Sequence, residues 1–272
     1  MTSNYRMSNP PAHRARKRFG QHFLHDRNII DKILRAIDVN EDDNYLEIGP
    51  GQGALTFPLL QQCKKLTAIE LDRDLIPLLN KGAIKFGELE VINADILKFE
   101  FDSLPEQSYR VVGNLPYNIS TPLMFHLLES VDKIRDMHFM VQKEVAQRIV
   151  AEVGSKNYGR LSIMMQYRCE CQYLFDVAPG CFTPPPKVDS AIIRLLPLVE
   201  PGFDVGDFAL FSSIVQTAFS QRRKTLSNSL KSIVSAEVFE LCGINKQLRA
   251  ENLSGHEFSL LTRKTLEMKK YD

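Results

Sequence analysis

The chain has 272 residues, of which 44% are hydrophobic and 25% are charged, and its formal net charge is +1 at pH 7. This composition is that of an ordinary globular protein with one large domain, or with one domain and a smaller companion. No hydrophobic run approaches the length of a membrane span or of a signal-peptide core, so we expect no membrane partner. The five cysteines form no CxxC pair and no zinc-like cluster, which predicts reduced thiols, a cytoplasmic setting and no metal site.

The N-terminal 25 residues carry cations but no Asp or Glu; the cations are Arg6, Arg14, Arg16, Lys17 and Arg18. Such a run is usually a solvated tail, and the alternative is an arm that contacts phosphate. Asp26 then suits a helix N-cap, and apolar residues follow at helical spacing. This pattern predicts a helix over about 27–38.

A glycine-rich turn follows the first predicted strand, in the stretch YLEIGPGQGALTF (45–57). Gly49, Gly51 and Gly53 allow the backbone to turn sharply and to approach a ligand at the start of a helix over 54–62. A pyrophosphate-binding loop has the spacing GxGxxG, whereas this turn has GxGxG, and the acidic Glu47 precedes it. The turn therefore suits a nucleoside with a carboxylate tail better than it suits a phosphate.

Acidic residues stand at the ends of the next two predicted strands, 66–69 and 89–92. Glu70 lies 21 residues after Gly49, where an acid that binds ribose hydroxyls is expected in nucleotide-binding βαβ units. Asp95 is a candidate acceptor for an adenine amino group, or an ordinary turn residue. Because ligands of open parallel sheets bind at the carboxyl ends of the strands, we expect these residues to lie together.

The fourth predicted strand, 108–112, leads into Asn114-Leu115-Pro116-Tyr117. The Asn114 amide both donates and accepts, and Pro116 keeps Leu115 out of the helical region, so the Leu115 carbonyl is available to a ligand. Tyr117 offers a flat apolar face. These four residues fit a clamp for a planar ring with an amino group, and they fit equally well an ordinary turn with a buried Tyr.

The alternation of strands and helices continues to about residue 202. Helices are predicted over 122–128, 145–150 and 161–167, and strands over 137–141 and 169–177, with a final strand at the end of 178–195. Phe182 lies in a Pro-rich turn before that final strand. An aromatic residue presented there is suited to stacking on a base, and the alternative is a buried loop anchor.

Only helices are predicted after residue 203, over about 208–219, 223–232, 236–242 and 257–268. This predicts three parts: a basic arm (1–25), a Rossmann-like α/β domain (26–202) and a small helical domain (203–272). Arg222, Arg223 and Lys224 stand at one predicted helix start, where cations oppose the helix dipole. This local conflict favours phosphate contact over a plain solvated run.

Eight blocks of the sequence together resemble a known family, the small-subunit (16S) ribosomal RNA adenine N6,N6-dimethyltransferases. The resemblance covers nearly the whole chain, and the last two blocks are the most specific. The blocks are RKRFGQHFL (16–24), LEIGPGQGALT (46–56), IELDRDL (69–75), NADIL (93–97), GNLPYNISTPL (113–123), MVQKEVA (140–146), FTPPPKVDSA (182–191) and AFSQRRKTLSNSL (218–230).

The resemblance implies an enzyme that uses S-adenosylmethionine to dimethylate two adjacent adenosines in a hairpin near the 3′ end of 16S rRNA. It also implies that the protein is a monomer and that its partner is the small ribosomal subunit. Roles in the biogenesis of that subunit and in sensitivity to kasugamycin are implied as well.

Cofactor contacts are implied for several residues. His22 and Leu24 contact the cofactor from the N-terminal segment, although many members carry Asn in place of His22. Gly49 and Gly51 line the methionine part, Glu70 takes the ribose hydroxyls and Asp95 the adenine amino group.

Asn114 is placed between cofactor and substrate. We expect the Asn114 side-chain oxygen and the Leu115 carbonyl to accept the two N–H bonds of the target amine, with Pro116 fixing that carbonyl. Tyr117 and Phe182 are expected to stack on the flipped base.

Two other classes of protein remain open at this stage. A nicotinamide-dependent oxidoreductase fits the glycine loop and Glu70, but not the loop spacing or the residues that follow Gly113. A non-catalytic RNA-binding assembly factor on the same fold is disfavoured because every expected cofactor position is filled.

Overall fold

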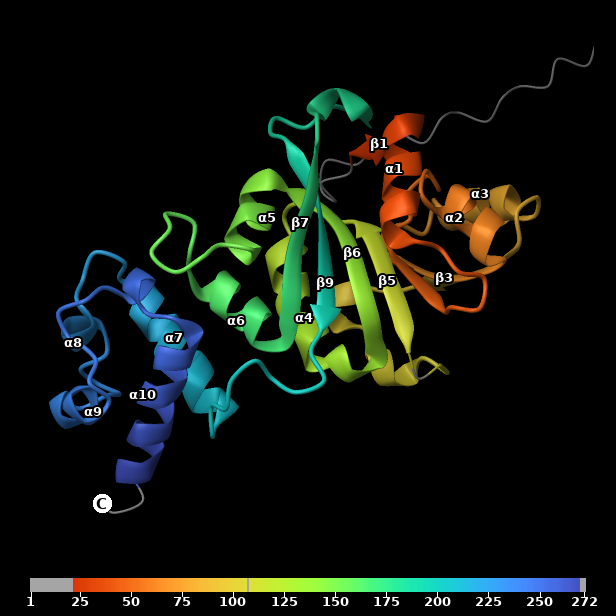
Figure 1. Cartoon of the computed structure of the whole chain (residues 1–272). Coiled ribbons are helices and arrows are strands. Elements are labelled where there is room, and N and C mark those ends of the chain that lie inside the picture. The colour runs from red at the N-terminus through yellow and green to blue at the C-terminus, as the bar shows by residue number, and fades with distance from the viewer. Residues whose placement is uncertain (1–21, 107, 270–272) are drawn as a thin grey trace, which may run out of the picture.

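A seven-stranded sheet forms the centre of the computed structural model, which describes residues 22–106 and 108–269 (Figure 1). The strands lie in the order β4-β3-β2-β5-β6-β9-β7. Their bounds are β2 (Tyr45–Ile48), β3 (Lys65–Glu70), β4 (Glu88–Asn93), β5 (Tyr109–Asn114), β6 (Ile134–Gln142), β7 (Cys169–Val177) and β9 (Ser190–Pro197). The predicted strands are thus confirmed, with ends that differ by a few residues.

The first five strands of this sheet are parallel, whereas β9 runs antiparallel between β6 and β7. From β2 the chain adds β3 and β4 on one side, and it then crosses to add β5 and β6 on the other. The strand order therefore reverses between β2 and β5. In open α/β sheets this reversal leaves a crevice at the carboxyl ends of the strands, where ligands bind.

Helices cover both faces of the sheet. Their bounds are α1 (Arg27–Ile37), α2 (Thr56–Cys63), α3 (Ile76–Ala83), α4 (Ser120–Glu129), α5 (Lys143–Ile149) and α6 (Arg160–Arg168). α1 forms as predicted: the Asp26 side chain accepts the Ile29 N–H at 3.1 Å, and its buried side is apolar. Such a cap satisfies an N–H group that the helix itself leaves unpaired.

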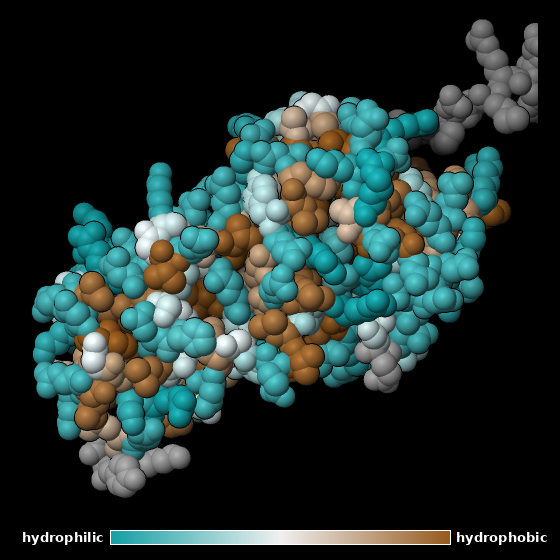
Figure 2. Space-filling model, viewed as in Figure 1, coloured by the Kyte–Doolittle hydropathy of each residue, from teal (hydrophilic) through white to brown (hydrophobic). Residues whose placement is uncertain are grey.

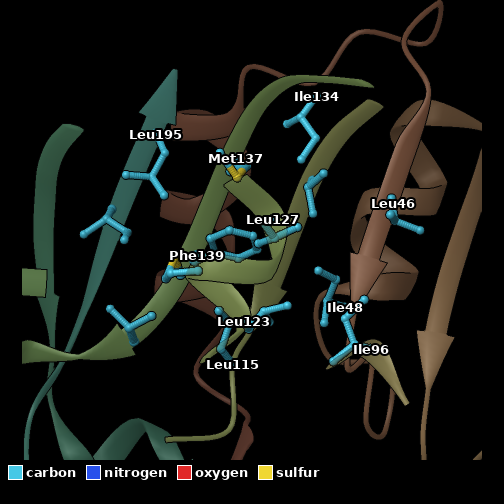
Figure 3. Packing of buried hydrophobic residues seen from close by; sticks show 14 of the residues in the cluster. Leu46, Ile48, Ile96, Leu115, Leu123, Leu127, Ile134, Met137, Phe139 and Leu195 are labelled. Carbon is cyan, nitrogen blue, oxygen red and sulfur yellow. The ribbon is translucent and has the colours of Figure 1, made fainter. Parts of the chain in front are cut away.

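Two hydrophobic clusters hold these helices on the sheet. On one face, α4 and α5 pack on side chains such as Leu46, Met137 and Phe139, several of which Figure 3 shows pointing toward one another. On the opposite face, α1 and α2 pack on residues such as Tyr45 and Val112. Because successive strand residues point to opposite faces, neighbouring positions on one strand serve different clusters.

The chain after residue 203 is helical and gathers at one end of the molecule (Figure 1). Its helices are α7 (Phe208–Ser220), α8 (Leu226–Ser229), α9 (Ala236–Leu241) and α10 (Gly255–Met268). Their hydrophobic cluster also contains Ile163, Met164 and Tyr167 of α6, whereas Met165 belongs to the cluster on the sheet. α6 therefore contributes to two hydrophobic cores. The predicted boundary between the α/β domain and the helical domain, near residue 203, stays a prediction.

A second, two-stranded sheet joins distant parts of the chain: β1 (Phe23–Leu24) pairs antiparallel with β8 (Phe182–Thr183). The sequence did not predict this pairing. On the face shown in Figure 2, hydrophilic residues surround smaller hydrophobic groups. Within the described part of the chain, no helix has the length and apolar character needed to cross a bilayer.

Candidate cofactor and substrate site

A cavity of about 380 Å³ opens at the carboxyl ends of β2, β3 and β5, where the strand order reverses. We call it the strand-end cavity. Every residue predicted to bind the cofactor or to act in catalysis lines it: His22, Leu24, Gly49, Gly51, Glu70, Asp95, Asn114, Leu115, Pro116 and Tyr117. The structure thus brings together residues that are spread over 96 positions of the sequence.

The glycine turn forms one wall of the strand-end cavity. Gly49 and Gly51 have φ values of +68° and +59°, in the left-handed region that side-chain-bearing residues rarely adopt. A Cβ on Gly51 would also lie 3.2 Å from the Phe23 ring. The two glycines therefore let the backbone turn under the N-terminal segment and form part of the cavity wall.

Glu70 holds this turn against the end of β3. Its carboxylate accepts the Gly51 N–H at 3.1 Å and the Asp72 N–H at 2.8 Å. The side chain is almost fully buried, and this burial raises its pKa. Each carboxylate oxygen has a second lone pair, so Glu70 can still accept from a ligand hydroxyl while it supports the loop.

Asp95 caps a turn and also lines the strand-end cavity. One oxygen accepts the Leu97 N–H at 3.1 Å and so caps a short 3₁₀ turn. The residue is partly exposed and also lines the strand-end cavity. Its other oxygen is thus available for an amino group.

The Asn114 amide is oriented by a contact with the N-terminal segment. Its Nδ2 donates to the His22 backbone carbonyl at 2.9 Å. Because a carbonyl only accepts, the NH₂ side of the amide must face His22, and Oδ1 points the other way. The acceptor side of the amide therefore faces away from His22, and Asn114 lines the cavity.

Leu115 and Tyr117 are both held in place. The Leu115 N–H donates to the Met140 carbonyl at 3.0 Å, while no described donor pairs with the carbonyl of Leu115. The Tyr117 hydroxyl is 2.6 Å from the Ser190 Oγ, and the His22 ring stacks on the Tyr117 ring at a centroid distance of 5.5 Å. A free carbonyl and a fixed aromatic ring thus lie at the edge of the cavity, beside Asn114.

Phe182 does not present its ring to a base, and this prediction is wrong for the structure. Its side chain is 2% exposed, it packs in the cluster beneath α1, and it does not line the cavity. Phe182 pairs with Leu24 in the small sheet and packs in the same cluster, whereas the next three residues, Thr183 to Pro185, are exposed. The alternative, a buried anchor, is the one that the structure supports.

The helix predicted over 223–232 is present only as the short α8, so its predicted start is wrong, and with it the argument about the helix dipole. α7 ends at Ser220, and α8 begins at Leu226 behind its N-cap residue Thr225. The three cations therefore follow the C-terminus of α7, where positive charge is favourable.

Arg222 has a structural role there. It donates to the Lys156 and Tyr158 carbonyls at 3.0 and 3.3 Å, and it lies 3.6 Å from a Glu251 carboxylate oxygen. Arg223 and Lys224 are exposed.

Two buried ionisable residues that line the cavity had been given no role. Glu47 is 2% exposed, and burial raises its pKa from 4.5 to about 8. His138 is 3% exposed, and burial lowers its pKa to about 4, so the ring is neutral at pH 7. Glu47 directly precedes the glycine turn in the sequence. His138 could have been found from the alternation along β6, which turns it and Met140 to one face.

The cations of the N-terminal arm lie outside the described residues. For the cofactor, the fit is specific: left-handed glycines bring the backbone to the cavity wall, and two acidic strand ends offer acceptors for a nucleoside. The fold and this site define an S-adenosylmethionine-dependent methyltransferase with a Rossmann-like α/β fold, as predicted.

The family model of the ribosomal RNA adenine dimethylases matches residues 12–265. The chain therefore belongs to the ribosomal RNA adenine dimethylase family. It is 53% identical over 267 residues to ribosomal RNA small subunit methyltransferase A of Pseudomonas aeruginosa, covering 96% of this chain and 98% of that protein. It is 51% identical over 248 residues to the protein of the same name from Marinobacter nauticus, with coverage of 91% and 90%.

Solved structures agree with this assignment. A dimethyladenosine transferase from Plasmodium falciparum matches with a TM-score of 0.76 at 30% identity, over 92% of this chain and 98% of that chain. The 23S rRNA methyltransferase ErmE matches with a TM-score of 0.69 at 27% identity, over 89% and 99%. Membership of an enzyme family that dimethylates ribosomal RNA excludes both alternatives, the nicotinamide-dependent oxidoreductase and the non-catalytic factor.

Proposed function

We propose that this enzyme dimethylates the N6 amines of two adjacent adenosines in a hairpin near the 3′ end of 16S rRNA, within the small ribosomal subunit. The observation that carries the proposal is the placement of an amide oxygen and a free carbonyl, from Asn114 and Leu115, in the same cavity as the acids at the ends of β3 and β4. The names of its relatives in Pseudomonas and Marinobacter support the small subunit as substrate.

Glu70 and Asp95 are the groups proposed to hold the nucleoside part of the cofactor. The carboxylate of Glu70 takes the ribose hydroxyls, and the second oxygen of Asp95 takes the adenine amino group. Gly49 and Gly51 let the methionine part approach the backbone, under the cover of His22 and Leu24. When bound, the cofactor supplies an electrophilic methyl group.

Asn114 and Leu115 act on the nucleophile. The lone pair of an adenine amine is delocalised into the ring, so the nitrogen is a weak nucleophile in its planar form. Two acceptors that take its two N–H bonds hold the nitrogen toward tetrahedral geometry, with the lone pair directed at the methyl group. The same acceptors stabilise the positive charge that develops on nitrogen, and Pro116 keeps the carbonyl in place.

Tyr117 supports the flipped base. Its hydroxyl is fixed by Ser190, so the ring offers a stacking surface that costs little conformational entropy on binding. After transfer, the ammonium product is a strong acid and loses its proton to water, so no dedicated base is required. In the second transfer only one N–H remains for the two acceptors.

RNA contact is proposed for Arg223 and Lys224, which are exposed beyond the end of α7, and for the basic N-terminal arm. Contacts of cations with phosphate bring affinity without base specificity. Arg222 is exposed as well, and its hydrogen bonds to the Lys156 and Tyr158 carbonyls hold this loop in place. We further propose that the protein works as a monomer in the cytoplasm, in the biogenesis of the small subunit and in sensitivity to kasugamycin.

The test uses small ribosomal subunits from cells that lack this gene. The purified enzyme, S-adenosylmethionine and these subunits are incubated, and the rRNA is digested and analysed by mass spectrometry. We expect two N6,N6-dimethyladenosines in adjacent positions of one rRNA fragment. Methylation of another base, or of the large subunit alone, would overturn the proposal.

A further inference from the structure

The segment that carries Phe182 lies against the N-terminal segment along four consecutive residues. The His25 N–H donates to the Cys181 carbonyl at 3.0 Å, and β1 pairs with β8 at Leu24↔Phe182 and Phe23↔Thr183. The His22 Nδ1 lies 2.7 Å from the Pro184 carbonyl, which makes Nδ1 the donor because the carbonyl only accepts. We call residues 181–184 the latch segment.

Burial anchors the latch segment. Phe182 is 2% exposed and Leu24 is 6% exposed, and both belong to the cluster that contains Met140 and Ile192 of the central sheet. The two facing side chains therefore fix both strands of the small sheet on the body of the protein. Truncation of either side chain to Ala is therefore expected to loosen the attachment of the N-terminal segment to the body of the protein.

The Asn114 amide depends on this arrangement. Within residues 22–106 and 108–269, its side chain makes a single hydrogen bond, to the His22 carbonyl. The His22 carbonyl is itself placed by the pairing of residues 22–25 with the latch segment. If the N-terminal segment moved away, the amide could turn by 180° and present NH₂ to an amine, where two donors oppose each other.

We propose that the latch segment orients the Asn114 amide through the His22 carbonyl, with Phe182 as a positioning residue for methyl transfer. This inference rests on the proposed function, in which Asn114 Oδ1 accepts from the target amine. Phe182 then acts through Asn114 and needs no contact with the base. A displacement of about 1 Å in a reacting group can cost on the order of 10²-fold in rate, so this indirect effect is measurable.

The first experiment compares Phe182→Leu with Phe182→Ala in single-turnover methyl transfer, at saturating S-adenosylmethionine. Leu keeps an apolar side chain in the buried site but has no aromatic face. We expect Phe182→Leu to stay within about threefold of the wild-type rate, and Phe182→Ala to lose about 10- to 10²-fold. An equal loss in both variants would overturn the proposal, because it would show that the aromatic face itself is needed.

The second experiment is a double-mutant cycle with Asn114→Ala. If Phe182 acts through Asn114, then Phe182→Ala costs little further rate once the amide is absent. Multiplicative losses would overturn the inference and assign Phe182 an independent contact.

If Phe182→Ala does not fold, Leu24→Ala gives a second cycle, because it loosens the same small sheet and leaves the Phe182 ring in place. Since Leu24 also lines the cofactor cavity, the affinity for S-adenosylmethionine is measured separately and all rates in this cycle are taken at saturating cofactor. We expect the same lack of additivity with Asn114→Ala, and additivity would again refute the latch.

These outcomes are distinct from failure of the proposed function. A wild-type enzyme that forms no dimethyladenosine would refute the proposed function itself. If the wild type is fully active and the rate losses of the single variants multiply in the double variants, only the role of the latch segment is refuted.

Discussion

Glu47 makes the stability of the cofactor-free protein depend on pH. The carboxyl group is fully buried at the end of β2. Burial raises its pKa from 4.5 to about 8, with the nearby Glu70 carboxylate adding to the rise and the Thr56 hydroxyl opposing it. The folded protein therefore keeps the proton of Glu47 at pH 7, whereas the unfolded chain releases it above pH 4.5.

The direction of the effect follows from proton binding. Below pH 4.5 the carboxyl is protonated in both states and contributes no pH dependence. Between pH 4.5 and 8 the folded state binds more protons than the unfolded state, so stability falls as the pH rises. The slope is about 1.4 kcal/mol per pH unit, and over this window the loss reaches about 5 kcal/mol.

Glu47→Gln removes this term and nearly preserves the volume of the side chain. The free energy of unfolding is measured by urea denaturation of both proteins from pH 5 to 8, without cofactor. We expect the free energy of unfolding of the variant to rise relative to that of the wild type by about 1.4 kcal/mol for each pH unit, until the difference levels off near pH 8. The Glu70 carboxyl titrates in both proteins, so it largely cancels in the comparison. A difference that stays constant from pH 5 to 8 would refute the reasoning.

Three further predictions concern the site and the RNA surface. Asn114→Ala should lower the single-turnover methylation rate by about 10²-fold or more at saturating cofactor, and a near-wild-type rate would contradict the amine clamp. Gly113→Ala should destabilise the fold by about 1–3 kcal/mol in thermal unfolding, because its Cβ would lie 2.6 Å from the Ile48 carbonyl oxygen, and an unchanged melting temperature would contradict this. Replacing both Arg223 and Lys224 by Ala should reduce the slope of log K against log salt for rRNA binding by about 1.4–1.8, with cofactor affinity unchanged. An unchanged slope would remove these two cations from the interface.

Most of the strand-end cavity could be predicted from the sequence because its parts are local. Gly49, Glu70, Asp95 and Asn114 each follow a short apolar run, and a parallel sheet brings the ends of such runs to one edge. The periodicity of the runs and the turn residues after them are enough to place these side chains. Their partner contacts, such as that between Gly51 and Glu70, were not predictable at the level of single atoms.

The predictions from the sequence fail where the structure depends on pairing between distant segments or on the exact start of a helix. An apolar run does not reveal its direction, so the antiparallel insertion of β9 beside β6 was not foreseen. Phe182 is buried because it pairs with a strand that lies about 160 residues earlier. The helix expected from 223 begins three residues later, and this small shift reversed the sign of the dipole argument for Arg222.

The pairing of β1 with β8 also sets an order of events during synthesis. Phe23 and Thr183 are partners, yet about 160 residues separate them in the chain. At about 5–20 residues per second, a ribosome needs about 8–32 s to extend the chain from one to the other. The strands that carry the glycine turn, Glu70 and Asn114 are complete well before then. A nascent chain therefore contains most residues of the cofactor site before β8, the partner of β1, has been synthesised. The cofactor site can close under β1 only after the last third of the chain has begun to emerge.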